Sequence, residues 1–131
     1  MKESLMILVA GPYRSGTQDK PELIQKNVQL MQEVALEVYK LGHLPVLGEW
    51  FALPLLETAG SKQIGDAVFN QIFHPVAVQL LDFCGAVLRV GGPSQGADEM
   101  LKVGLEKGKR IFYSLSEIPM VEKAEASLAG E

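Results

Sequence analysis

The chain is poor in the residues that form disulfides or bind metals. Its 131 residues contain one cysteine, Cys84, and two histidines, His43 and His74. One cysteine cannot close a disulfide within the chain or build a multi-cysteine zinc site, and a lone thiol fits the reducing cytoplasm. Neither histidine has a Cys, Asp or His partner at a ligand spacing, so both are interpreted as structural. We therefore expect a cytoplasmic protein with no metal and no other cofactor.

An excess of positive charge and a long apolar run are also missing. Sixteen acidic and twelve basic residues give a net charge of -4, which excludes a general nucleic-acid binder. The apolar run at residues 5–10 is too short for a membrane span or a signal peptide, and it is interpreted as a buried strand. The length predicts one domain, residues 1–119, followed by a tail at 120–131 that is either a short helix or frayed.

What the chain does contain is an alternation of strand-like and helix-like segments. Apolar runs predict strands at residues 5–10, 43–47, 86–90 and 110–113. Apolar residues at helical spacing predict helices at residues 20–41, 65–83 and 97–107, whereas residues 48–61 are interpreted as a loop with a short helical piece at 53–58. This alternation predicts a three-layer α/β sandwich of the flavodoxin- or Rossmann-like class, with a parallel sheet of four to five strands in the order 2-1-3-4(-5).

Single residues add detail to this fold. Asp19 is expected to be the N-cap of the first long helix, and Asp66 to lie in the N-cap region of the second. Pro45 places the second strand at a sheet edge, and Pro75 is expected to kink its helix. A charge in the third strand is costly unless it is paired, so Arg89 is expected to have a carboxylate partner or to lie exposed at the end of the strand.

A glycine-rich loop follows the first strand, and another follows the third. In a sheet of this order the carboxyl ends of these strands meet where the strand order reverses, which is where ligands bind. The candidate binding residues of the first loop are Gly11, Tyr13, Arg14, Ser15, Gly16 and Thr17. Its hydroxyls and guanidinium suit an anion, although Thr17 replaces the lysine of an ATP-binding P-loop. The alternative is a plain turn with a solvated arginine.

The second loop leads directly into a helix. Its candidate binding residues are Gly92, Pro93, Ser94 and Gly96. A helix N-terminus is a natural site for a phosphate or a sugar hydroxyl. Asp98 and Glu99 follow in the first helical turn, where they would compete with a phosphate, so they suit gripping a ribose or attacking its anomeric carbon. The alternative is that both acids only cap the helix.

Two further candidates follow the second strand, close to the same sheet edge. Glu49 is placed to bind a ribose or to share a proton, and Trp50 to stack on a base. For Trp50, packing in the core is the alternative.

The chain resembles the nucleoside 2-deoxyribosyltransferase-like superfamily, which includes nucleotide N-glycosidases. The resemblance is carried by Gly-Pro-Tyr-Arg-Ser-Gly at residues 11–16, Gly-Pro-Ser-x-Gly at 92–96 and Gly-Lys-Arg-Ile at 108–111. It implies that the first loop surrounds the sugar and phosphate, that Ser94 contacts the phosphate, and that a glutamate on the following helix attacks C1′. The position of that glutamate holds Met100, with Glu99 one place earlier. The second loop also resembles the motif of the lysine decarboxylase-like phosphoribohydrolases.

These observations give two functional hypotheses. The first is cleavage or transfer at the N-glycosidic bond of a nucleoside or nucleoside 5′-monophosphate, with Glu99 or Asp98 as the nucleophile. The alternative is a nucleotide-binding module without catalysis. For either, we expect a small-molecule ligand, no nucleic acid, no membrane, and a homodimer or larger even homo-oligomer. The apolar residues expected in the subunit interface are Phe69, Ile72, Phe73 and Val76. For Phe69, Ile72 and Phe73, packing in the core is the alternative.

Overall fold

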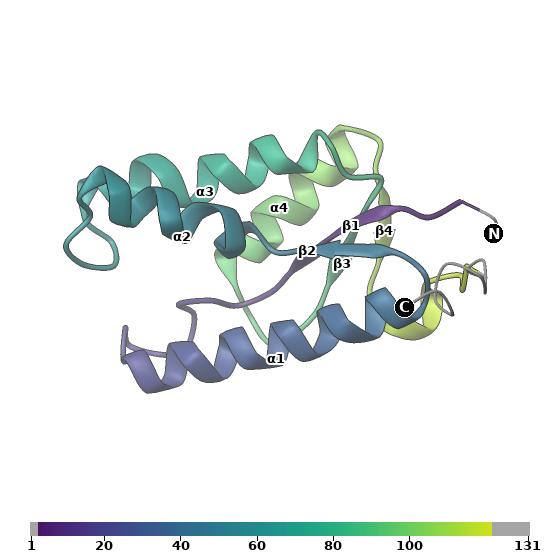
Figure 1. Ribbon diagram of the computed structural model, residues 1–131, viewed down its shortest axis with the longest axis horizontal. Coiled ribbons are helices and arrows are strands. Elements are labelled where there is room, and N and C mark those ends of the chain that lie inside the picture. Colours follow the sequence, from purple (N-terminus) through teal and green to yellow (C-terminus); the bar gives the residue numbers. More distant parts are fainter. Residues whose placement is uncertain (1–2, 122–131) are drawn as a thin grey trace, which may run out of the picture.

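The structure is an α/β fold built on one parallel sheet (Figure 1). This computed structural model describes residues 3–121. The elements in chain order are β1 (Met6–Ala10), α1 (Pro21–Lys40), β2 (Leu44–Val46), α2 (Gly48–Ala59), α3 (Ala67–Leu81), β3 (Ala86–Arg89), α4 (Gln95–Glu106), β4 (Arg110–Phe112) and a 3-10 turn (Leu115–Glu117). Within the described residues the sheet has four strands in the order β2-β1-β3-β4, all parallel. The predicted fold class and strand order are confirmed.

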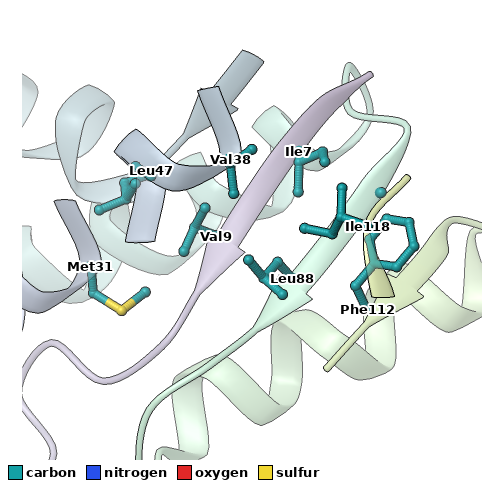
Figure 2. Close-up of a cluster of buried hydrophobic side chains, with 10 residues drawn as sticks. Ile7, Val9, Met31, Val38, Leu47, Leu88, Phe112 and Ile118 are labelled. Carbon is teal, nitrogen blue, oxygen red and sulfur yellow. The ribbon is translucent and has the colours of Figure 1, made fainter. Parts of the chain in front are cut away.

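The three layers follow from the alternation of side chains along the strands. Figure 1 shows α1 on one face of the sheet and α2, α3 and α4 on the other. Ile7 and Val9 of β1 pack with α1 in one cluster of buried side chains (Figure 2). Leu8 and Ala10 point to the opposite face and pack with residues of α3 and α4. Because successive side chains of a strand point to opposite faces, an unbroken apolar run fits a sheet covered on both sides.

Helix α1 begins differently from the prediction. Its N-cap is Lys20, which makes no side-chain capping hydrogen bond, and Pro21 occupies the first turn. Asp19 is therefore not the N-cap. Its φ of 59° turns the residue out of the helical path, and its carboxylate binds the guanidinium of Arg14 instead. Side-chain pairing in the loop has replaced the expected cap.

Helix α2 is a full helix of 12 residues where a loop with a short helical piece was expected. Ala52 and Leu56 are buried four residues apart, so one face of the helix packs against the rest of the fold. Pro54 lies inside this helix, and Gly60 ends it in the left-handed conformation that glycine adopts easily. The packing of a buried face has prevailed over the low helix propensity of proline and glycine.

The caps of α3 and α4 fix where these two helices start. Asp66 is the N-cap of α3, as predicted, and its carboxylate accepts a hydrogen bond from the Phe69 N–H at 2.8 Å. Several backbone N–H donors lower the pKa of Asp66 to about 2. Ser94 caps α4 by accepting from the Ala97 N–H at 3.1 Å. Helix α4 therefore begins at Gln95, two residues earlier than predicted.

His43 links three segments of the chain. It is 2% exposed, and its Nδ1 accepts a hydrogen bond from the Leu5 N–H at 3.0 Å. Because Nδ1 is an acceptor there, Nε2 of the neutral ring carries the proton and donates to the Pro119 carbonyl at 2.6 Å. The structural role expected for His43 is confirmed.

No helix within residues 3–121 combines the length and the apolar character that crossing a bilayer requires. Residues 122–131, which make up most of the tail expected to be helical or frayed, lie outside the described residues.

We predict that His43→Leu lowers the free energy of unfolding by about 2 kcal/mol, because the Leu5 N–H and the Pro119 carbonyl lose their partner. Urea denaturation measures the change. His74→Leu is the matched control, since the His74 side chain is 39% exposed, and a change below about 1 kcal/mol is expected there. Equal losses in the two variants would contradict the role given to His43.

Candidate functional site

A cavity of about 490 Å³ lies at the carboxyl ends of β1 and β3, where the strand order reverses. Its residues come from β1, the loop after it, the first turn of α2 and the first two turns of α4, with one side of α3. The lining residues are Leu8, Val9, Ala10, Gly11, Tyr13, Arg14, Ser15, Gln18, Asp19, Gly48, Glu49, Phe69, Phe73, His74, Ala77, Ser94, Gly96, Ala97 and Met100. Both glycine-rich loops thus meet at one site.

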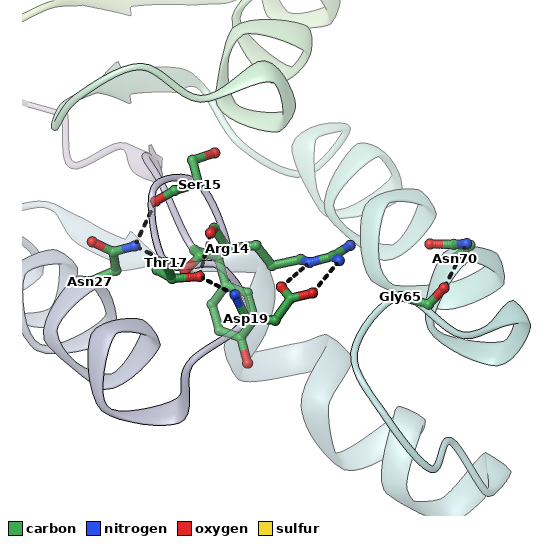
Figure 3. A network of polar contacts seen from close by, with 8 residues as sticks. Arg14, Ser15, Thr17, Asp19, Asn27, Gly65 and Asn70 are labelled. Carbon is green, nitrogen blue, oxygen red and sulfur yellow. Dashed lines mark hydrogen bonds and ion pairs between the residues drawn. The ribbon is translucent and has the colours of Figure 1, made fainter.

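The loop after β1 is held in shape by its own hydrogen bonds (Figure 3). The Asn27 amide on α1 donates to the Tyr13 carbonyl at 2.9 Å. The Thr17 hydroxyl donates to the Arg14 carbonyl and accepts from the Asp19 N–H. Gly11 is required at the start of the loop, because a Cβ there would lie 2.8 Å from the Val90 carbonyl oxygen, which the backbone holds in place.

Arg14 and Asp19 form a bidentate ion pair on the cavity wall. Nε of Arg14 lies 2.9 Å from one carboxylate oxygen, and Nη2 lies 2.9 Å from the other (Figure 3). This hydrogen bonding raises the pKa of Arg14 and lowers that of Asp19. Gly65, at a φ of 87°, leaves room for the guanidinium, since a Cβ there would be 3.0 Å from Nη2. The positive charge of Arg14 is therefore neutralised by Asp19, a residue of the same loop.

Aromatic rings form another part of the wall. Phe69 and Phe73 of α3 stack with their centroids 4.6 Å apart, and Tyr13 packs on Phe73 at 4.8 Å. The Arg14 guanidinium lies 5.4 Å from the Phe69 centroid. These contacts make an apolar wall in which Phe69 is buried and Phe73 remains half-buried.

The N-terminus of α4 lines the cavity through Ser94, Gly96 and Ala97. The first N–H groups of a helix have no helical acceptor and attract an anion. A Cβ built on Gly96 meets nothing within 4 Å, so the backbone there is open to a ligand. The Ser94 hydroxyl accepts the capping hydrogen bond from Ala97, and its own proton is left to donate.

The two acids proposed as nucleophiles lie outside this lining. Asp98 accepts a hydrogen bond from Nε of Arg89 at 3.0 Å, which confirms the carboxylate partner expected for Arg89. Glu99 lies 3.3 Å from Nε2 of His74, and its side chain is 52% exposed. Met100, one residue further along α4, is 5% exposed and lines the cavity. Successive residues of a helix differ by about 100° in direction, which accounts for the difference.

The structure brings together one part of the predicted site. The predicted residues that line the cavity are Gly11, Tyr13, Arg14, Ser15, Glu49, Ser94 and Gly96. The predicted residues outside the lining are Gly16, Thr17, Trp50, Gly92, Pro93, Asp98 and Glu99. Thr17 is buried within its own loop, and Trp50 is 41% exposed, away from the cavity.

Sequence reasoning missed the contribution of α3. Phe69 and Phe73 are expected in the core or in a subunit contact, and His74 is expected to be structural. Phe69 is indeed buried, at 5% exposure, but all three side chains also line the cavity. Phe69 and Phe73 share one helical face through their i, i+4 spacing, but the sequence does not say whether that face meets core or ligand.

Glu49 is the one carboxyl group of the lining without a charged partner in the described contacts. It lies in the first turn of α2, and its buried Oε2 has no hydrogen-bond partner. Burial raises the pKa of Glu49 to about 7, although a hydrogen bond from its own backbone N–H acts in the opposite direction. The pKa of Tyr13 is raised by burial and by the charge of Glu49, so these two side chains are neighbours.

Comparison with known proteins leaves the site to be interpreted from its own geometry. No protein-family model matches the chain, and no curated protein matches it significantly. Residues 3–121 contain no group of three or more His, Cys, Asp or Glu side chains placed to hold a metal ion.

We predict that Glu49→Gln stabilises the protein at pH 8 by on the order of 2 kcal/mol. The raised pKa means that the folded state binds more protons than the unfolded state between about pH 4.5 and 7, so stability falls as the pH rises through that window. Glutamine carries no charge, and its advantage should therefore shrink towards pH 5. Thermal unfolding of both proteins from pH 5 to 8 measures it. The exposed Glu57→Gln on the same helix is the control, and an advantage independent of pH would contradict the prediction.

Proposed function

We propose that this cavity binds a nucleoside or nucleoside 5′-monophosphate. The observation that carries the proposal is the presence, in one cavity, of an aromatic wall and the open N-terminus of α4. The half-buried ring of Phe73 suits the flat base, and the N–H groups near Gly96 suit a phosphate or a sugar hydroxyl. The location at the reversal of strand order supports the same interpretation.

Arg14 would bind the phosphate of a 5′-monophosphate by exchanging its present partner, Asp19, for the phosphate. In the structure its guanidinium binds Asp19, and both side chains are partly exposed in the cavity wall. A phosphate offers the same bidentate geometry with more charge. When a 5′-monophosphate binds, its phosphate takes the place of the Asp19 carboxylate. The Arg14 guanidinium is then paired both before and after binding.

The second candidate is cleavage or transfer at the N-glycosidic bond. In that reaction a carboxylate forms a bond to C1′, the bond from C1′ to the base breaks, and the base leaves with the electron pair and takes a proton. Water or another base then takes the sugar from the carboxylate. The favouring observation is the largely buried Glu49 carboxyl, whose pKa of about 7 suits proton transfer to a leaving base. The nucleophile candidate is Glu99, whose carboxylate contacts the cavity residue His74.

Binding is tested by thermal unfolding with nucleosides and 5′-monophosphates. A ligand of the folded state raises the melting temperature, and 5′-monophosphates should do so more than nucleosides. Arg14→Gln should weaken 5′-monophosphate binding by about tenfold or more, because a charge-assisted hydrogen bond is lost. Asp19→Asn should strengthen it by about two- to fivefold, because an exposed ion pair no longer competes. Asp82→Asn, in the exposed ion pair with Lys107, is the matched control.

Catalysis is tested by long incubation with the same ligands, followed by detection of free base. We expect none. Base release at or above the amount of protein would contradict a pure binding module and support the second candidate. Loss of release in Glu99→Gln would then assign the nucleophile, whereas unchanged release would remove Glu99 from the mechanism.

We also propose that the chain forms a homodimer or a larger even oligomer. Phe69 is 5% exposed and Phe73 lines the cavity, so of the residues expected in the interface Ile72 and Val76 are left to form it. They line a shallow groove between α2 and α3 together with Leu55, which is 51% exposed. Light scattering should give an even multiple of 14.3 kDa, and Ile72→Glu should lower it. A mass of 14.3 kDa for the unaltered chain would contradict the proposal.

A further inference from the structure

Glu49 combines two features that packing alone does not explain. Its side chain lines the cavity, and its Oε2 atom is buried without any hydrogen-bond partner. Burial raises the pKa of this carboxyl, and the Glu49 N–H, which favours the ionised form, offsets only part of the rise. Buried carboxyl oxygens are nearly always hydrogen-bonded, because an unpaired one has lost its water without a replacement. The unmet acceptor therefore points to a missing donor.

We infer that Glu49 is the residue that selects the ligand, by accepting hydrogen bonds from a donor pair on the nucleoside as an ionised carboxylate. This inference rests on the proposed function and adds the kind of nucleoside that the cavity takes. One oxygen atom can accept two hydrogen bonds, so Oε2 can receive both donors.

Two parts of a nucleoside carry such a donor pair. One is the ribose, with its neighbouring 2′ and 3′ hydroxyls. The other is the edge of a guanine base, with its N1–H and 2-amino groups. The chemistry that Glu49 recognises is the same in both, and 2′-deoxyribose or a base without the amino group offers one donor fewer.

No charged group of the lining forms an ion pair with the Glu49 carboxylate in the described contacts. From the loop after β1 the cavity receives Tyr13, Arg14 and Asp19, and from α3 it receives His74. Arg14 is paired with Asp19, and His74 with Glu99. The lining residues of β1 and α4 carry no titratable group, and the other acid of α2 is the exposed Glu57. Among the described residues of the lining, no cation is left over for Glu49, so a ligand that needs its ionised form must release a proton.

The test is calorimetric titration with uncharged nucleosides from pH 6 to 8. Nucleosides are used because the second ionisation of a 5′-monophosphate falls near pH 6 and would add its own pH dependence. Guanosine affinity should rise about tenfold from pH 6 to 8, following ionisation of a carboxyl with a pKa of about 7. At pH 6, two buffers of different ionisation enthalpy should report the release of nearly one proton. Glu49→Gln should bind more weakly than the unaltered protein at pH 8 and lose the pH dependence, whereas Glu57→Gln should keep both.

Two ligand comparisons identify the source of the donors. Weaker binding of 2′-deoxyguanosine than of guanosine, in the unaltered protein but not in Glu49→Gln, assigns the donors to the ribose. Weaker binding of inosine, which lacks the 2-amino group, assigns them to the base under the same condition. Both comparisons use proteins whose melting temperatures show that they are folded.

The outcomes separate this inference from the proposed function. Equal affinity and equal pH dependence in the unaltered protein and Glu49→Gln would overturn the role of Glu49 and leave nucleoside binding standing. Affinity that falls with rising pH would likewise overturn it, since the neutral carboxyl would then be the binding form. Absence of binding by every nucleoside and 5′-monophosphate, to folded protein at each pH, would overturn the proposed function and this inference together.

Discussion

The parallel pairing of β1 with β3 is the constraint on which the site depends. Their register matches Ile7 with Ala86 and Ala10 with Arg89, so both strands end at the same level of the sheet. The loops that follow must therefore leave side by side, although about 80 residues separate them in the chain. Strand β2 lies on the outer side of β1, and β4 lies on the outer side of β3. Helices α1 and α4, which lead to these two strands, therefore run away from each other, and this opens the space between the loops. The cavity is a consequence of strand order before any side chain is considered.

Within that cavity the fold treats its charges in two different ways. The Arg14 guanidinium is satisfied by Asp19, a residue of the same loop held at a φ of 59°. Glu49, by contrast, has a buried oxygen with no partner. The ion pair keeps the Arg14 charge in the cavity wall at little cost in folding free energy. The unpaired Glu49 carboxyl lowers the stability of the fold at any pH at which it is ionised. An unpaired buried group calls for a functional explanation, and both Arg14 and Glu49 are in the lining of the same cavity.

Patterns that depend on local chemistry could be predicted from the sequence. The apolar runs predicted the strands, the glycine-rich loops predicted the sheet edge at which the cavity lies, and Asp66 was expected in the cap region of α3. Features decided by tertiary contact could not be predicted. Helix α2 forms because Ala52 and Leu56 are buried, and Asp19 leaves its cap position because Arg14 binds it. The aromatic wall was missed for a related reason, since an apolar helix face looks the same whether it meets core or ligand.

The distinction between Glu99 and Met100 depends on the rotation of α4 about its axis, and the packing of that helix fixes the rotation. Ser94 sets the first turn, and Ala97, Met100 and Gly104 then face inward at spacings of three and four residues. Gly104 is the tightest point, because a Cβ there would lie 2.9 Å from a methyl group of Val87 in β3. Turning Glu99 into the cavity would require about 100° of rotation, which would bring a side chain against Val87. The cap at Ser94 and the close packing at Gly104 thus favour the rotation that keeps the acid out of the cavity and the methionine in it.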